Sequence, residues 1–197
     1  IQATCGIKVK VLSEEEEATL VYRGVINSMD IPKGIILEIG GGSTKIVYYN
    51  RRNMLNYSTL PFGAVTLTDL FKDGNLSPEE QAEKVEEFFT EQLSQIEWLS
   101  TVDPDVQMIG VGGSFRNIFK ISKLVRKYPL DTVHNYHLPV EDFESIYDMI
   151  KVLDLDKKKK IKGISTARAD ILPAALAVVK SFVHFMHFEN FIIGGSG

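Results

Sequence analysis

The chain has 197 residues, a length that accommodates one ordinary domain or two small ones. Its 44% hydrophobic and 24% charged residues are typical of a globular protein with a sizeable core, and its net charge of −4 gives no global attraction to nucleic acid or acidic membranes. The single Cys5 excludes an intrachain disulfide and no stretch is apolar enough to span a membrane, so we expect a cytoplasmic protein without nucleic-acid or membrane partners.

The first predicted elements are a strand and an acidic helix. Residues 7–12 alternate apolar and polar side chains, as a half-buried strand does. Ser13 then begins a helix to about Asn27, and Glu16 stands three positions after Ser13, which is the spacing of a capping box. The four acids at residues 14–17 fall in the first turn of this helix, where the helix dipole favours negative charge.

The most informative segment is residues 35–49. An apolar run ends at Ile39, three glycines and a Ser-Thr pair follow, and a second strand-like run covers residues 45–49. This pattern predicts a strand, a tight turn and a strand, and residues 53–60 would complete a three-strand meander. Bare glycine backbone lets a ligand approach closely, and successive N–H groups in such a turn form a nest for an anion. The turn is therefore a candidate phosphate site, with an ordinary hairpin turn as the alternative.

Glu38 lies two residues before the first glycine, where its carboxylate could hold a metal or a water beside a bound phosphate. The candidate phosphate-binding residues of this segment are Gly40, Gly41, Gly42, Ser43, Thr44 and Lys45.

A second glycine loop appears after a run of predicted helices. We expect a short helix over residues 64–71, and Ser77, Pro78 and Glu80 mark a helix start whose core-facing side chains continue to about residue 99. Residues 106–111 then form a short buried strand that leads into Gly112, Gly113 and Ser114 and a helix through residue 124. At this loop a phosphate could meet bare backbone and the positive end of a helix.

The C-terminal part predicts helices, one strand and a third glycine loop. Residues 127–137 look irregular, and helices are expected over residues 140–153, 157–162 and 166–185, the last of which is apolar on most faces and should be central. Residues 190–193 read as a strand before the glycine-rich end. Because loops after parallel strands converge at one edge of a sheet, three such loops predict a ligand site at that edge.

Four stretches resemble motifs of the exopolyphosphatase/guanosine pentaphosphate phosphatase family, and their order and approximate spacing agree over essentially the whole chain. They are residues 13–18, 38–45, 60–67 and 167–173. The resemblance implies an α/β fold of the actin, sugar kinase and Hsp70 superfamily: one ribonuclease H-like domain over residues 1–197, with a mixed sheet, a three-strand antiparallel meander and flanking helices. It also implies that the domain is the second of a two-domain parent whose first domain is missing here.

Members of that family are Mg²⁺-dependent hydrolases that remove terminal phosphate from polyphosphate or guanosine pentaphosphate, and they often dimerise. The resemblance places Glu17 as the general base that activates the attacking water, and Glu38 as the carboxylate that holds the metal. It places two phosphate loops at Gly40, Gly41, Gly42, Ser43 and Thr44, and at Gly112, Gly113 and Ser114. The implied partners are polyphosphate or a guanosine polyphosphate, the missing domain and a second copy of the chain.

Three positions depart from the family pattern. Glu38 replaces an aspartate and reaches one methylene further, and Glu14 replaces a glycine at a close backbone approach. Lys45 replaces the acid that closes the glycine motif. An ammonium there could bind phosphate directly or replace part of the metal's charge, but it cannot ligate Mg²⁺.

These departures keep three hypotheses open. The first is a phosphoanhydride hydrolase whose isolated second domain has weak or no activity. The second is a degenerate module that binds or senses polyphosphate or a nucleotide without hydrolysing it. The third, which the chain supports least because it shows no adenosine-site features, is an ATP-using relative of the sugar or acetate kinases.

Three further groups have both a functional and a structural interpretation. The lysine-rich residues 157–162 are usual on a solvated helix face, although a polyphosphate chain would also attract them. Arg168 and Asp170 are interpreted as a structural pair or cap near the central helix, with substrate contact as the alternative. His184 and His187 have the spacing of metal ligands, but without a third ligand we interpret them as structural or surface residues.

Overall fold

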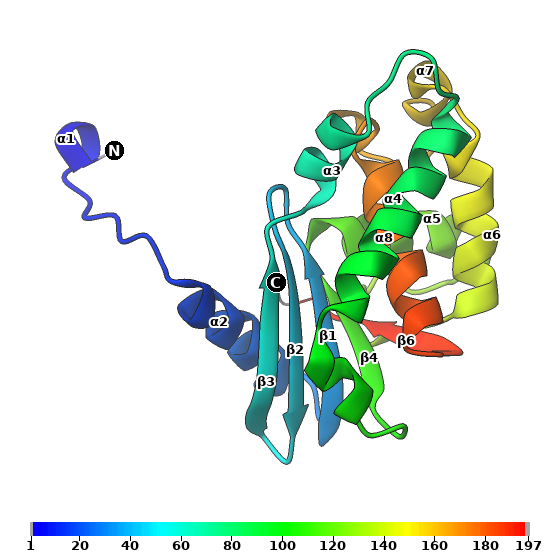
Figure 1. Cartoon of the computed structure of the whole chain (residues 1–197). Helices are drawn as coiled ribbons and strands as arrows, with labels where there is room; N and C mark the ends of the chain where they lie inside the picture. Colours follow the sequence, from blue (N-terminus) through cyan, green and yellow to red (C-terminus); the bar gives the residue numbers. More distant parts are fainter. Residues whose placement is uncertain (1, 196–197) are drawn as a thin grey trace.

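A computed structural model describes residues 2–195 and shows a single mixed sheet with helices on both faces (Figure 1). Its strand order is β3-β2-β1-β4-β6-β5. The strands are β1 (Lys33–Ile39), β2 (Thr44–Asn50), β3 (Asn53–Leu60), β4 (Gln107–Val111), β5 (Tyr136–Pro139) and β6 (Asn190–Ile193). The mixed α/β class that the sequence predicts is therefore confirmed.

The sheet combines a meander with a parallel centre. β1, β2 and β3 are antiparallel neighbours, β4 pairs with β1 in parallel, and β6 pairs with β4 in parallel. At the far edge β5 runs antiparallel to β6. The carboxyl ends of β1, β4 and β6 consequently lie at the same edge of the sheet, and each is followed by glycines, as the sequence predicts.

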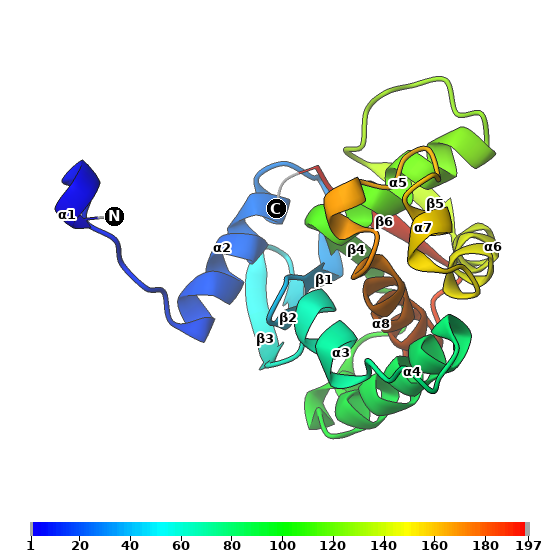
Figure 2. The same ribbon diagram turned by 90° about the horizontal axis from the view of Figure 1, so that it is seen from above.

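The helices cover the two faces unequally (Figure 2). α2 alone packs on one face, mainly against β3 and β2, and the other face carries a large helical layer. The helices are α1 (Gln2–Cys5), α2 (Glu14–Ile26), α3 (Ala64–Leu70), α4 (Pro78–Ser94), α5 (Gly113–Val125), α6 (Val140–Lys151), α7 (Leu155–Lys158) and α8 (Leu172–Phe185), with 3₁₀ turns at Glu97–Thr101 and Thr166–Arg168.

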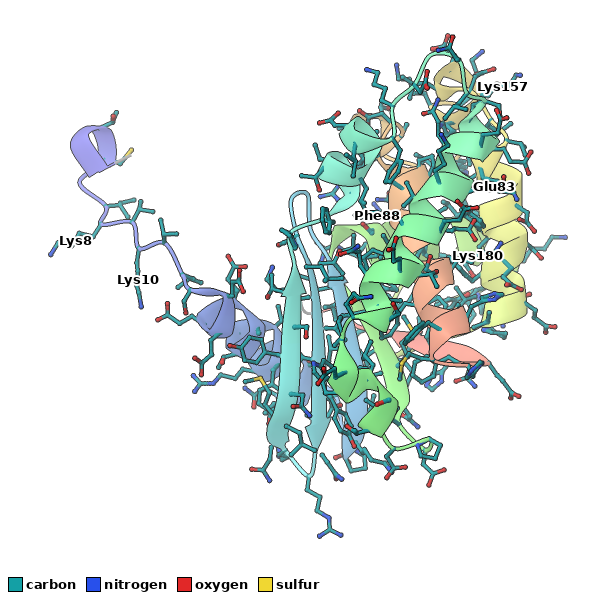
Figure 3. All side chains as sticks on the ribbon, in the orientation of Figure 1. Lys8, Lys10, Glu83, Phe88, Lys157 and Lys180 are labelled. Atoms are coloured by element: carbon teal, nitrogen blue, oxygen red, sulfur yellow. The ribbon has the colours of Figure 1, made fainter. Side chains whose placement is uncertain are left out.

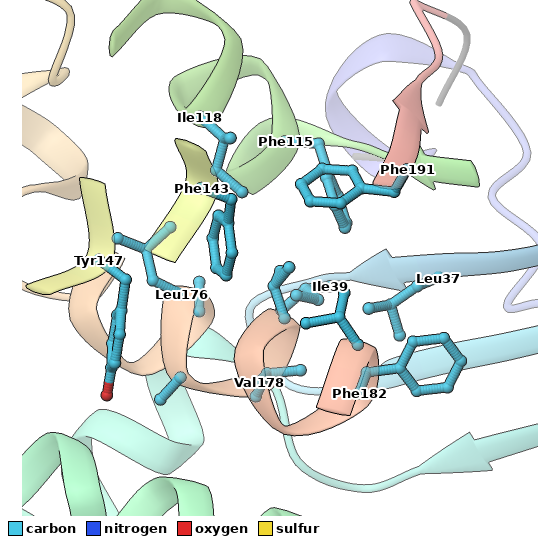
Figure 4. Close-up of a cluster of buried hydrophobic side chains, with 14 of the residues drawn as sticks. Leu37, Ile39, Phe115, Ile118, Phe143, Tyr147, Leu176, Val178, Phe182 and Phe191 are labelled. Atoms are coloured by element: carbon cyan, nitrogen blue, oxygen red, sulfur yellow. The ribbon is translucent and has the colours of Figure 1, made fainter. Parts of the chain in front are cut away.

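The core explains why the middle of β1, residues 35–37, has apolar side chains at successive positions. Leu37 and Ile39 belong to the large cluster under the helical layer, whereas Ile36 belongs to the smaller cluster under α2. A strand covered on both faces needs apolar side chains at every position. Figure 4 shows the larger cluster, where Phe182 of α8 lies beside Leu37. As the sequence predicts, α8 is central, and most of its residues are buried.

Sequence signals for helix ends agree well with the structure. The Ser13 side chain accepts a hydrogen bond from the Glu16 backbone, and Glu16 returns one to the Ser13 backbone, which completes the predicted capping box of α2. The same box closes the start of α4 at Ser77. Two helices are shorter than expected. α8 begins at Leu172 rather than near residue 166, with Pro173 in its first turn, and α7 has only one turn.

The strand predicted over residues 7–12 is wrong for the part of the chain that the structure describes. This segment extends away from the sheet and has no regular structure (Figures 1 and 3). Val11 is 90% exposed, and Ile7 and Val9 are more than half exposed. Alternation alone cannot make a strand, since the backbone N–H and C=O groups need a neighbouring strand as a partner. The opposite error occurs at β5. The sequence predicts an irregular segment over residues 127–137, but residues 136–139 form this strand.

The packing of Gly110 generates a stability prediction. A Cβ added at Gly110 would lie 2.1 Å from the Phe115 ring, which is fully buried. We expect Gly110→Ala to lower the free energy of unfolding by about 1–3 kcal/mol, because the ring must leave its packed position. Urea denaturation measures this, with Gly74→Ala as control, since nothing lies within 4 Å of a Cβ there. Equal losses in the two variants would contradict the packing argument.

Candidate functional site

The hairpin between β1 and β2 presents bare backbone at the sheet edge. The Gly40 N–H donates to the Ser43 carbonyl at 2.9 Å, which closes the turn, and the Gly40 and Gly41 carbonyls accept hydrogen bonds from the start of α3. These bonds hold the loop in one conformation. Within the described residues, the N–H groups of Gly41 and Gly42 have no backbone partner, and both glycines are exposed. They are available to an anion, as the glycine pattern predicts.

The hydroxyl groups of Ser43 and Thr44, which follow these glycines, make different contacts. Thr44 is fully buried, and its hydroxyl donates to the Phe62 carbonyl at 2.7 Å, so this side chain ties the loop to the chain that follows β3. Ser43 is only partly buried and its hydroxyl accepts a hydrogen bond from Lys45. The backbone of this turn, rather than the Thr44 side chain, is what faces a ligand.

The second loop joins β4 to the N-terminus of α5. Gly112 has φ +93°, a left-handed conformation that disfavours residues with a side chain. No side chain caps α5, so its first N–H groups remain directed at the sheet edge. Helix N-termini of this kind bind anions through these groups and through the helix dipole. A Cβ on Gly112 would lie 3.5 Å from Glu38, which places this loop beside the carboxyl end of β1.

The structure places Arg168 at this site, whereas the sequence favoured a structural role for it over contact with a substrate. Its guanidinium lies so close to Gly113 that a Cβ there would be 2.5 Å from Nη1. The structural pair with Asp170 does not form; Asp170 instead accepts a hydrogen bond from its neighbour Ile171. Among the described residues Arg168 makes no ion pair, and it is exposed. A planar guanidinium beside a helix N-terminus is a suitable group for phosphate oxygens.

Glu17, Glu38 and Lys45 form one ionic cluster. Glu38 and Lys45 are direct partners in the β1–β2 register, and the Lys45 Nζ lies 3.3 Å from Glu38 Oε2. The first turn of α2 brings Glu17 Oε2 to 2.9 Å from the same nitrogen. Ser43 Oγ accepts at 3.3 Å. The two predicted catalytic carboxylates, far apart in the sequence, are therefore joined by the residue that departs from the family pattern.

Lys45 is charged in this setting. Burial would lower its pKa, but the hydrogen bond that the ammonium donates to Glu17 and the negative charge of Glu38 outweigh that cost, and the net effect raises the pKa. The side chain is almost fully buried, whereas the Glu17 side chain is 43% exposed. The cluster thus has an inner ammonium and an outer carboxylate that solvent can reach.

The Mg²⁺ that the resemblance implies does not fit these residues. Both carboxylates available to it are engaged by the Lys45 ammonium. Within residues 2–195, no group of three or more His, Cys, Asp or Glu side chains is arranged to hold a metal ion.

The remaining candidates lie outside this cluster. His184 pairs with Glu144, which agrees with a structural or surface role. Lys158, expected on a solvated face, is buried, and burial lowers its pKa. Gly195 lies after β6, and its N–H donates to His134 Nδ1 at 3.2 Å, while residues 196–197 of the third loop lie outside the described residues. No helix in the described part of the chain is long and apolar enough to cross a membrane.

A comparison of the sequence with protein families decides which family this is: the profile of the Ppx/GppA phosphatase family matches residues 1–197. The chain belongs to this family. The resemblance seen in the motifs is thereby confirmed for the whole length of the sequence.

Individual Ppx/GppA relatives and structures agree. A bifunctional 3-dehydroquinate synthase/phosphatase of Fusobacterium nucleatum is 26% identical over 95% of this chain and 28% of its own length. A guanosine-5'-triphosphate,3'-diphosphate pyrophosphatase of Photobacterium profundum is 27% identical over 96% of this chain and 37% of its own length. The chain thus spans about a third of these curated relatives.

The fold is shared with a crystal structure of an exopolyphosphatase from Cytophaga hutchinsonii, which superposes with a TM-score of 0.88 at 21% identity. The match covers 100% of this chain and 64% of that one. This likeness confirms the predicted fold class.

The ionic cluster generates a second stability prediction. Lys45→Met would leave Glu17 and Glu38 facing each other without a counter-charge. We expect a loss of about 1–3 kcal/mol in the free energy of unfolding, below the cost for a fully buried pair because both carboxylates keep some contact with solvent. Chemical denaturation measures it, with Lys157→Met as control, because that lysine side chain is 66% exposed in its pair with Asp154. A Lys45 variant as stable as the control would contradict the assigned role.

Proposed function

We propose that this chain is the phosphate-chain-handling domain of a hydrolase that releases terminal phosphate from polyphosphate or guanosine pentaphosphate. One observation carries the proposal: the bare hairpin at Gly41 and Gly42 follows β1, the uncapped N-terminus of α5 follows the adjacent parallel strand β4, and the same edge of the sheet carries Glu17 and Glu38. Family membership supports it, as do relatives named for a guanosine polyphosphate or an exopolyphosphatase activity.

The residues present suit this chemistry. Phosphoryl transfer needs positioning, neutralisation of charge on the phosphate oxygens and an oriented nucleophile. In the proposed reaction, backbone N–H groups of both loops and the Arg168 guanidinium hold the terminal phosphate. Glu17 orients a water on the solvent side of the cluster and accepts its proton. The water oxygen bonds to phosphorus, the bridging P–O bond breaks, and its electron pair leaves with the shortened chain.

Several parts of the proposal extend beyond the described residues. A first domain in the parent protein would supply the opposite wall of the cleft, in agreement with the length of the relatives. A homodimer and a cytoplasmic location remain predictions. The Mg²⁺ requirement implied by the family also remains a prediction, and the engagement of both carboxylates by Lys45 argues against it.

A second function is favoured by that same engagement. A site whose general base is held by an ammonium would bind a phosphate chain and hydrolyse it slowly or not at all. The module would then sense or store the ligand. Calorimetry with polyphosphate and guanosine tetraphosphate, together with a phosphate-release assay, separates the two functions. Binding without turnover supports the sensing module, and no binding removes it.

The role of Glu17 is tested by turnover. We expect Glu17→Gln to lower phosphate release from polyphosphate by roughly 10²–10⁴-fold in the full-length parent protein, because the amide cannot accept the water's proton. Glu15→Gln is the matched control, since Glu15 is an exposed neighbour on the same helical turn. An unchanged rate in Glu17→Gln would show that another group is the base.

The role of Arg168 is tested by binding. Gly113→Ala would push the guanidinium aside without moving backbone, because the added Cβ meets only the end of a flexible side chain. We expect this variant and Arg168→Met each to weaken tripolyphosphate binding roughly tenfold, the loss of one charge-assisted contact. In the double variant the second change should add little. Additive losses in calorimetry would show that the two residues act separately.

A further inference from the structure

The geometry points to Lys45 as a built-in cation that takes the place of a divalent metal, so that this site binds phosphate chains without one. The inference rests on the proposed function for the nature of the ligand. It goes beyond that function because it assigns a role to Lys45. The Lys45 ammonium supplies the positive charge that Mg²⁺ is expected to supply in the relatives.

The position of the ammonium carries the first step. The resemblance assigns a metal to the carboxylate at Glu38, and Lys45 Nζ lies 3.3 Å from Glu38 Oε2 and 2.9 Å from Glu17 Oε2. The position of Lys45 is fixed by the sheet. Its Cα is paired with that of Glu38 in the antiparallel β1–β2 register, and its side chain is almost fully buried. The ammonium is therefore part of the sheet edge rather than a mobile surface charge.

The contacts of the ammonium carry the second step. Three oxygens lie within 3.3 Å of Lys45 Nζ: one carboxylate oxygen each from Glu17 and Glu38, with which it forms ion pairs, and Ser43 Oγ, which accepts a hydrogen bond. With these oxygens around it, Lys45 neutralises the carboxylates and leaves direct phosphate contact to the loop N–H groups and Arg168. This supports the second of the two roles that the sequence allowed for a lysine here.

The incompatibility with Mg²⁺ carries the third step. Mg²⁺ binds oxygen ligands at about 2.0–2.1 Å and requires a nearly ideal octahedral arrangement of them. Lysine offers no acceptor to such a shell. A divalent ion would have to displace an ammonium that two carboxylates already hold, against the repulsion between the two positive charges. Lys45 is therefore the side chain that excludes the metal.

The test is a titration of the 197-residue chain with Mn²⁺ in the absence of phosphate, in which electron paramagnetic resonance measures the bound Mn²⁺. We expect the wild type and Glu38→Gln to give the same Mn²⁺ titration, because Glu38 is not a ligand. We expect Lys45→Glu, which restores an acid at this position, to bind Mn²⁺ roughly tenfold or more tightly than the wild type. Adding Glu38→Gln to Lys45→Glu should remove that gain.

Two controls keep the result interpretable. Lys157→Glu makes the same charge change at an exposed position on α7 and should not gain Mn²⁺ binding (Figure 3). If three facing carboxylates destabilise Lys45→Glu, its thermal midpoint should rise with Mn²⁺, whereas that of the wild type should not. Wild-type Mn²⁺ binding that Glu38→Gln abolishes would overturn the inference, and this measurement needs no folded Lys45 variant.

Ligand binding separates this inference from the proposed function. Wild-type calorimetry with tripolyphosphate in EDTA should show binding, and Gly113→Ala should weaken it. If tripolyphosphate binds neither in EDTA nor with Mg²⁺ present, the proposed function fails, whatever the Mn²⁺ titrations show. If it binds only when Mg²⁺ is present, the proposed function stands and the built-in cation is wrong.

Discussion

The candidate site depends on the parallel pairing of β1, β4 and β6. This pairing directs three strand ends to one edge of the sheet, where glycines allow the backbone to turn and leave N–H groups exposed. It also brings Glu38 at the end of β1 against Gly112 after β4. The core on both faces holds the register, because a shift of one residue in β1 would exchange Ile36 with Leu37 between two differently shaped clusters.

Electrostatics then determines what this edge can hold. Two acids and one lysine leave the cluster with one net negative charge, and the nearby positive groups are the helix N-terminus and Arg168. In the proposed reaction, a phosphate chain would therefore meet its favourable contacts on the α5 side and the Glu17 carboxylate on the α2 side.

Sequence patterns predicted most of the elements because each pattern has a local physical cause. Capping boxes at Ser13 and Ser77 satisfy backbone groups within one turn, and the middle of β1 is covered on both faces and therefore needs apolar side chains at successive positions. The predictions failed where the formation of a strand depends on a partner strand that is distant in the sequence. The alternating residues 7–12 have no strand to pair with in the described part of the chain, and residues 136–139 become β5 only because β6 lies beside them.

The same distinction holds for the site. From the residues alone, the sequence determined the glycine turns and the position of Glu38 beside them, since chemical type and local spacing are sufficient for these. The resemblance to the family added the role of Glu17 and the departure at Lys45. The tertiary structure decided that Lys45 joins Glu17 to Glu38, that Thr44 is a structural tie, and that Arg168 lies against Gly113. No local rule contains these contacts, because each is made by elements that only strand pairing and helix packing bring together.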